Sequence, residues 1–174
     1  MTTDATLTDR ASHAAAQWRR ERPDLDPFPM ELLGRLQALT LLITQQHLSP
    51  LFARFGLQPG EFDVLATLRR AGAPYQLTPT DLYETAMISS GGMTNRIDRL
   101  EAAGMVVREK HPTDRRGTLV CLTDAGLTLI NELVELHLRN EEQILAGLSP
   151  TEQVTLNQLL LKWMHTLQHQ QPTA

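Results

Sequence analysis

Six basic side chains are concentrated in residues 96–116, and they suit contacts with phosphate better than catalysis. They are Arg96, Arg99, Arg108, Lys110, Arg115 and Arg116, against the four acids Asp98, Glu101, Glu109 and Asp114. Six against four gives this segment a net charge of +2, while the whole chain carries −4 and the remainder therefore −6. A basic segment in an acidic chain is typical of a local nucleic-acid contact surface, although an ordinary solvated hairpin has the same composition.

Catalytic and metal-binding patterns give little support for an enzyme. The sequence contains no Gly-x-Ser-x-Gly, no phosphate-loop lysine motif and no His-Glu-x-x-His. His165 and His169 have the four-residue spacing of a metal pair, but they lie in a polar C-terminal tail. We therefore expect a protein that is not an enzyme and that has no metal or cofactor.

The basic segment overlaps a predicted helix and a two-stranded ribbon within residues 89–122. Ser89 or Ser90 can cap the helix, and Gly104 suits its left-handed C-terminal residue. Its apolar stripe consists of Met93, Ile97 and Leu100. The turn composition of residues 112–117 separates two apolar, strand-like runs. This is the arrangement of a winged helix-turn-helix, in which the helix enters the DNA major groove and the wing reaches the minor groove.

Helical phase assigns the residues that would contact DNA. The positions that lie mostly away from the apolar stripe are expected to face base edges: Ser90, Gly91, Thr94 and Asn95. Arg99 is expected to bind DNA as well. At the tip of the wing, Arg116 is expected to enter the minor groove and Arg115 to contact phosphate, while Asp114 orients the loop by hydrogen bonding.

The remaining sequence predicts long helices on both sides of this DNA-binding unit. A helix capped by Thr8 extends to about Arg22, and a long helix covers residues 30–55. Further helices are expected from Pro59 to about Arg70, from the Thr78 cap to about residue 87, from Thr123-Asp124 to about residue 146, and from the Ser149 cap onward. Tyr75-Gln76-Leu77 is expected to be short and extended.

The terminal helices carry apolar seams that need a partner. Leu156, Leu160, Trp163 and Leu167 follow one another at four, three and four residues. Such seams can pack within one chain, or they can hold a homodimer that presents two recognition helices about 34 Å apart. We favour the homodimer. The expected organisation is an extra N-terminal helix and linker in residues 1–29, a helical dimerisation region in 30–56 and 124–170, and a winged helix-turn-helix domain in 57–123.

Length and composition agree with a mainly α fold that has a small β wing. The chain has 174 residues, 41% of them hydrophobic, and no stretch approaches the roughly 20 apolar residues of a membrane span. The N-terminus has no apolar signal-peptide region. We therefore expect a cytoplasmic protein without a membrane partner. Its single cysteine, Cys121, is expected to be a small buried side chain rather than a redox sensor.

At this level of detail the sequence resembles the MarR family of winged-helix transcriptional regulators over nearly its whole length. The most specific part is Asp114–Gly126, which is similar to the family's Asp-x-Arg wing signature and the Leu-Thr-x-x-Gly that follows it. Residues 61–65 and 94–100 are also typical of the family. One feature is unusual: Gly91-Gly92 falls in the expected first turn of the recognition helix, where each glycine costs up to about 1 kcal/mol.

A narrower resemblance points to the urate-responsive branch of this family, which includes PecS-like and HucR-like regulators. In that branch a tryptophan on an extra N-terminal helix, an aspartate and two arginines form the effector site. The resemblance matches these positions to Trp18, Asp63, Arg96 and Arg108. It implies a repressor that a small planar aromatic anion such as urate releases from a pseudo-palindromic double-stranded operator.

The residues themselves leave alternatives open at these positions. Trp18 can be a core anchor, a pocket wall or both, and Asp63 lies either on the outer face of its helix or beside a cation. Arg96 is about 60° from the apolar stripe, so it can point toward the protein body. Two arginines and an aromatic ring suit a planar anion. The alternative function is a constitutive or architectural DNA-binding dimer without an effector.

Overall fold

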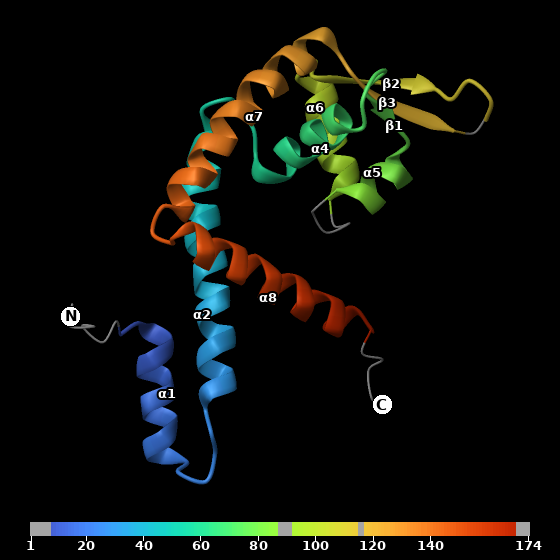
Figure 1. Ribbon diagram of the computed structural model, residues 1–174. Helices are drawn as coiled ribbons and strands as arrows, with labels where there is room; N and C mark the ends of the chain where they lie inside the picture. Colours follow the sequence, from blue (N-terminus) through green and yellow to red (C-terminus); the bar gives the residue numbers. More distant parts are fainter. Residues whose placement is uncertain (1–7, 87–91, 115–116, 170–174) are drawn as a thin grey trace. The chain divides into compact units, whose positions relative to one another are not determined.

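The computed structural model describes residues 8–86, 92–114 and 117–169, and it is mostly helical with a small antiparallel sheet (Figure 1). The chain divides into two compact units, one up to Gly56 and the other from Leu57 onward. None of the helices in the described ranges is long and apolar enough to cross a membrane. The mainly α fold with a β wing that the sequence predicted is confirmed.

The first unit contains α1 (Arg10–Glu21), α2 (Phe28–Leu42), the π-helical segment η1 (Ile43–Leu48) and α3 (Ser49–Ala53). The expected Thr8 cap is wrong by one residue. Asp9 is the N-cap, and its carboxylate accepts a hydrogen bond from the Ser12 N–H at 2.8 Å, which satisfies an otherwise unpaired donor of the first turn. The long helix expected at residues 30–55 is interrupted by the π-helical segment, which periodicity alone does not reveal.

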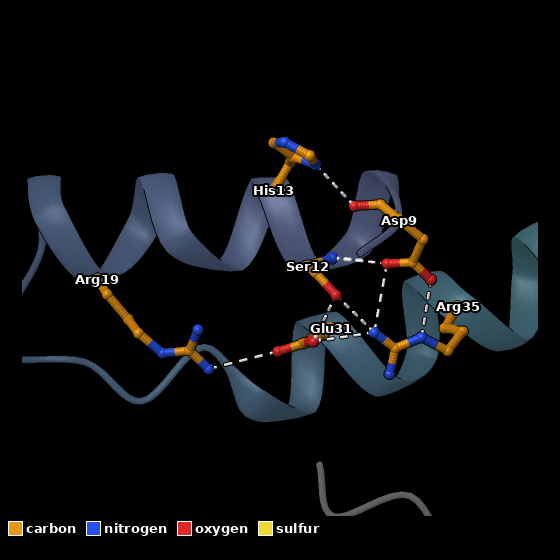
Figure 2. Close-up of polar contacts among 6 residues, drawn as sticks. All are labelled: Asp9, Ser12, His13, Arg19, Glu31 and Arg35. Atoms are coloured by element: carbon orange, nitrogen blue, oxygen red, sulfur yellow. Dashed lines mark hydrogen bonds and ion pairs between the residues drawn. The ribbon is translucent and has the colours of Figure 1, made fainter. Parts of the chain in front are cut away.

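A polar cluster joins α1 to α2, and Figure 2 shows its members (Asp9, Ser12, His13, Arg19, Glu31 and Arg35). Arg35 Nε donates to Asp9 Oδ2 at 2.8 Å, and its Nη2 donates to Glu31 Oε1 at 2.9 Å. The Arg35 guanidinium holds the pKa values of both carboxyls below their usual range. This cluster fixes α1, the helix that carries Trp18, against α2.

The second unit is built around α4 (Pro59–Arg70), which contacts α5 (Pro79–Thr85), α6 (Met93–Ala102), α7 (Asp124–Leu145) and the sheet. The predicted bounds of α4 are confirmed. Its buried side chains meet those of the neighbouring elements in one core, which includes Phe62, Val64, Leu65, Leu68, Leu82, Ile97, Leu100, Val120, Ile130 and Leu133. The apolar stripes of several helices are thereby removed from water.

The sheet consists of β1 (Gln76–Leu77), β2 (Val106–Lys110) and β3 (Thr118–Leu122) in the order β1-β3-β2. β2 and β3 form the predicted antiparallel wing, with Arg108 opposite Val120. The extended segment predicted at Tyr75–Leu77 supplies the third strand. Cys121 is buried, as expected, and burial raises the pKa of its thiol.

Predicted capping signals are confirmed at three helices. Thr78 and Asp81 form a reciprocal capping box at α5, which follows directly from the Thr-Pro-Thr-Asp sequence. The Thr123 hydroxyl accepts from the Gly126 N–H at 3.0 Å at the start of α7. Glu152 accepts from both the N–H and the hydroxyl of Ser149 at the start of α8 (Pro150–His169).

None of the side chains of α8 in the described range is buried. The predicted seam is therefore open to solvent in the single chain: Leu156 is 39% exposed and Leu167 55% exposed. Large apolar side chains that are exposed in a single chain commonly mark an interface with another chain.

Candidate DNA-recognition helix and effector site

The recognition helix α6 begins later than the sequence suggested. Gly92 is the N-cap and has a φ of 86°, so the helix starts at Met93. A left-handed residue cannot belong to a right-handed helix, and glycine adopts this conformation without strain. The placement of Gly92 in the first turn is therefore wrong, and the N-cap is Gly92 rather than a serine. Ser89, Ser90 and Gly91 lie outside the described residues.

The two faces of α6 are as predicted. Met93, Ile97 and Leu100 are buried in the core, whereas Thr94 and Asn95 are exposed. The exposed side is available for base edges in a major groove. The contact of Thr94 and Asn95 with base edges stays a prediction.

The wing turn closes through hydrogen bonds of the Asp114 backbone. The Gly117 N–H donates to the Asp114 carbonyl at 3.0 Å, and the Asp114 N–H donates to His111 Nδ1 at 3.1 Å. A Cβ at Gly117 would come within 2.8 Å of His111 Cβ, so the tight turn requires glycine. Arg115 and Arg116, the predicted phosphate and minor-groove contacts, lie outside the described residues.

Arg99 connects α6 to the first turn of α4. Its Nε lies 2.7 Å from Glu61 Oε1, and the other oxygen of this carboxylate accepts from the Gln58 N–H at 2.8 Å. Glu61 is only 3% exposed, whereas just over half of the Arg99 side chain faces solvent. One arginine can thus hold the recognition helix and still present charge to DNA.

Arg108 connects α6 to the start of the wing. Its guanidinium forms ion pairs with Asp98, at 2.5 Å, and with Glu101. The backbone N–H of Arg108 also donates to Glu101 Oε1 at 3.0 Å. Partial burial alone would lower the pKa of Arg108, but the hydrogen bonds to both carboxylates raise it above its ordinary value. Both acids belong to α6, so Arg108 fixes the C-terminal half of the recognition helix to β2.

Arg96 lies against the N-terminal turn of α4. A Cβ added at Gly60 would overlap the Nε of Arg96 and would come within 2.9 Å of its Cδ and Cζ. The side chain of Arg96 is partly buried. It therefore points toward the protein body, one of the orientations that its helical phase allowed, and the absence of a side chain at Gly60 makes the approach possible.

Asp63 is half-buried on α4, three residues after Gly60, the position that the Arg96 side chain covers. Burial raises the pKa of this carboxyl, while electrostatic interactions with His137, Arg70 and Arg96 act in the opposite direction. Of the two alternatives that the sequence left open for Asp63, partial burial within reach of cations is the one observed.

The predicted effector residues of the second unit have two kinds of surroundings. Asp63 and Arg96 influence each other electrostatically, while Arg108 is engaged by the carboxylates of α6. Trp18 belongs to α1 in the first unit and is 45% exposed, so it is not a buried core anchor of its own helix.

Sequence reasoning did not identify Glu61, Arg70 or His137 as part of this region. Glu61 carries a usable signal, because an acid at the third position after a helix start is typical of a capping box. The His137 ring on α7 packs against the Phe62 ring at an interplanar angle of 54°, with centroids 4.5 Å apart, and His137 Nε2 lies 3.1 Å from Glu141 Oε1. Its proximity to α4 depends on tertiary packing and leaves no local pattern.

Known proteins with this architecture are numerous. The MarR family model matches residues 55–117. The HTH-type transcriptional regulator PecS of Dickeya dadantii is 45% identical over 149 residues, covering 86% of this chain and 89% of PecS.

Two solved structures illustrate the likeness further. A mutant MarR from E. coli complexed with operator DNA has a TM-score of 0.66 and 26% identity, covering 83% of this chain and 96% of that one. Bordetella bronchiseptica BpsR, whose DNA binding is regulated by 6-hydroxynicotinic acid, has a TM-score of 0.64 and 29% identity, covering 76% and 90%. Together with the winged helix-turn-helix geometry, these matches show that the chain belongs to the MarR family of transcriptional regulators.

Proposed function

We propose that this regulator is a homodimeric repressor that a small planar aromatic anion, such as urate, releases from a pseudo-palindromic operator. The observation that carries the proposal is the pairing of Arg108 with two carboxylates of the recognition helix, Asp98 and Glu101. A bound anion competes for the same guanidinium, since a planar fork of donors binds carboxylates and other oxyanions alike. Effector binding would therefore loosen the element that reads DNA.

For DNA binding, the proposal uses the exposed face of α6 and the wing. Thr94 and Asn95 contact base edges, and Ser90 and Gly91, which lie outside the described residues, are proposed to do the same. Arg99 and Arg115 contact phosphate, and Arg116 enters the minor groove. The E. coli MarR complex supports the use of operator DNA as the partner in this family.

Asp63 supplies the second part of the response. Its carboxylate is half-buried near Arg96, a residue of the recognition helix. An anion bound beside it raises the cost of a second negative charge at this site and competes for Arg96. The Trp18 ring would provide the stacking surface, and for this residue the support is the family resemblance alone.

The size of the expected effect is moderate. A coupling of about 1–3 kcal/mol between effector and DNA weakens operator binding roughly 5- to 150-fold. Reciprocity requires that operator DNA weaken effector binding by the same factor. The structurally similar BpsR, whose DNA binding is regulated by 6-hydroxynicotinic acid, supports an aromatic acid as the class of effector.

A thermal-shift series with urate, xanthine and 6-hydroxynicotinate tests the effector site. We expect at least one of these anions to raise the melting temperature of the wild-type protein and to lose this effect in Arg108→Ala. The exposed Arg139, which pairs loosely with Glu135 at 3.7 Å on α7, provides the matched control Arg139→Ala. Absence of stabilisation by all three anions would favour the alternative, a constitutive or architectural DNA-binding dimer.

A further inference from the structure

One face of α4 carries a row of polar side chains that none of the contacts described so far explains. Asp63, Thr67 and Arg70 are separated by four and three residues, so they project from the same side of the helix. Gly60, three residues before Asp63, lies on this side too, and the Arg96 side chain covers it. The Asp63 carboxylate therefore has an arginine toward each end of the helix.

Arg70 is oriented back along this row. Side chains of an α-helix lean toward its N-terminus, and Arg70 Nη2 donates to Thr67 Oγ1 at 3.1 Å. Thr67 is 3% exposed, so its hydroxyl holds the guanidinium at the edge of the core. Asp63 and Arg70 are about 10 Å apart along the axis, at 1.5 Å per residue, and the long arginine side chain covers part of this distance.

The same guanidinium also holds the end of α5. Arg70 Nη2 donates to the carbonyl of Thr85, the last residue of that helix. A cation at this position satisfies a carbonyl that has no partner within the helix, and it opposes the negative end of the helix dipole. α5 is the first helix of the helix-turn-helix, so Arg70 joins the Asp63 face of α4 to that motif.

We propose that Arg70 is a further cation for the anionic effector, beside Arg96 and Arg108, and that its withdrawal from the Thr85 carbonyl transmits effector binding to α5. This inference rests on the proposed function and extends it, because release of DNA would proceed through α5 as well as through α6. The favourable effect of Arg70 on the ionised form of Asp63 agrees with a shared electrostatic environment. An anion with oxygens at opposite edges of a planar ring would find Arg96 on one side and Arg70 on the other.

The test combines urate binding with hydrogen exchange of the α5 amides, with 6-hydroxynicotinate as the second probe. In the wild-type protein, the anion that binds should accelerate exchange at the amides of residues 82–86. Arg70→Gln should bind this anion about tenfold to a hundredfold more weakly, the range expected for one charge-assisted hydrogen bond. Its α5 exchange should be fast without the anion and unchanged by it.

Three further variants make the result specific. Arg70→Lys keeps the charge but not the planar fork, so its anion affinity should fall between those of wild type and Arg70→Gln, and it replaces that variant if circular dichroism shows Arg70→Gln unfolded. Thr67→Val keeps the side-chain shape and removes one anchor of Arg70, so α5 exchange should rise. Arg139→Gln, the same substitution at an exposed site, should behave as wild type.

The outcomes separate the inference from the proposed function. If the wild-type protein binds urate or 6-hydroxynicotinate and releases DNA, while Arg70→Gln and Arg70→Lys bind as tightly as wild type, the role of Arg70 is overturned and the proposed function stands. Unchanged α5 exchange in a wild-type protein that binds the anion has the same meaning. If neither anion binds the wild-type protein, both the inference and the proposed function are overturned.

Discussion

Arg99 Nε lies 2.7 Å from the buried Glu61 carboxylate, so a residue on the recognition helix is anchored by the first turn of α4. The same carboxylate completes the cap of α4. The position of the DNA-reading surface is therefore tied to the start of the helix that carries Asp63.

The first prediction concerns this ion pair. Glu61→Gln removes the charge and keeps the shape, and it should lower the free energy of unfolding by about 1–3 kcal/mol, the range for a buried polar group that loses its partner, here the Arg99 cation. Urea unfolding measures the change. Arg99→Ala should cost a similar amount, because it leaves the Glu61 carboxylate buried without this cation.

DNA binding distinguishes the two variants. If Arg99 also contacts phosphate, Arg99→Ala should reduce the slope of log affinity against log salt concentration by about 1, whereas Glu61→Gln should leave the slope unchanged. Equal slopes for wild type and Arg99→Ala would assign Arg99 a positioning role only.

A second prediction concerns the acids that hold Arg108. Glu101→Gln and Asp98→Asn each remove one competitor for its guanidinium, so either variant should bind the effector several-fold more tightly. Operator affinity should decrease, because α6 loses part of its connection to β2. Calorimetry and fluorescence anisotropy measure the two affinities. An effector affinity that falls in both variants would show that these acids help to bind the anion.

These connections show where sequence reasoning succeeds and where it stops. The caps at Thr78, Thr123 and Ser149 depend on residues within four positions of one another, and all three were predicted correctly. The buried stripe of α6 follows from periodicity in the same way. Caps and apolar stripes can be predicted because they depend only on short stretches of sequence.

Pairs that tertiary packing creates were not predicted. Arg99 and Glu61 are 38 positions apart, and neither flanking sequence identifies the other. The contact between Arg70 and Thr85, the polar cluster around Arg35 and the position of His137 are further examples. The left-handed cap at Gly92 was missed for a different reason, because two adjacent glycines fit either a helix start or the turn before it.

A third prediction uses the pH dependence of stability. Burial raises the pKa of Asp63 in the folded protein, so the folded state binds a proton more tightly than the unfolded state. The stability that comes from this tighter proton binding is fully present below the pKa of Asp63 in the unfolded state. It is lost as the pH rises through the pKa of Asp63 in the folded state. Asp63→Asn should therefore be more stable than wild type at pH 7, and this difference should shrink toward pH 4.

Urea unfolding at the two pH values tests this account. A stability difference that grows as the pH falls would mean that the Asp63 carboxylate is net stabilised by its cations, contrary to the proposal. In effector assays at pH 7, Asp63→Asn should bind the anion at least as well as wild type and respond to it less.

A fourth prediction concerns the dimer. Burial of the seam on α8 would remove several large side chains from water, each worth about 1.5–3 kcal/mol when fully buried. Removal of residues 148–174 should abolish both dimerisation and tight operator binding. Light scattering measures the mass. A stable dimer of the truncated chain would place the interface elsewhere.

The most direct test of the central claim is release of operator DNA by an anion. A palindromic operator can be obtained by selection from a randomised duplex pool with the full chain, and its complex followed by fluorescence anisotropy during titration with urate and with 6-hydroxynicotinate. We predict that at least one anion weakens wild-type binding roughly 5- to 150-fold, and that the effect is lost in Arg108→Ala but kept in Arg139→Ala. Operator affinity that neither anion changes, or equal release in all three proteins, would contradict the account.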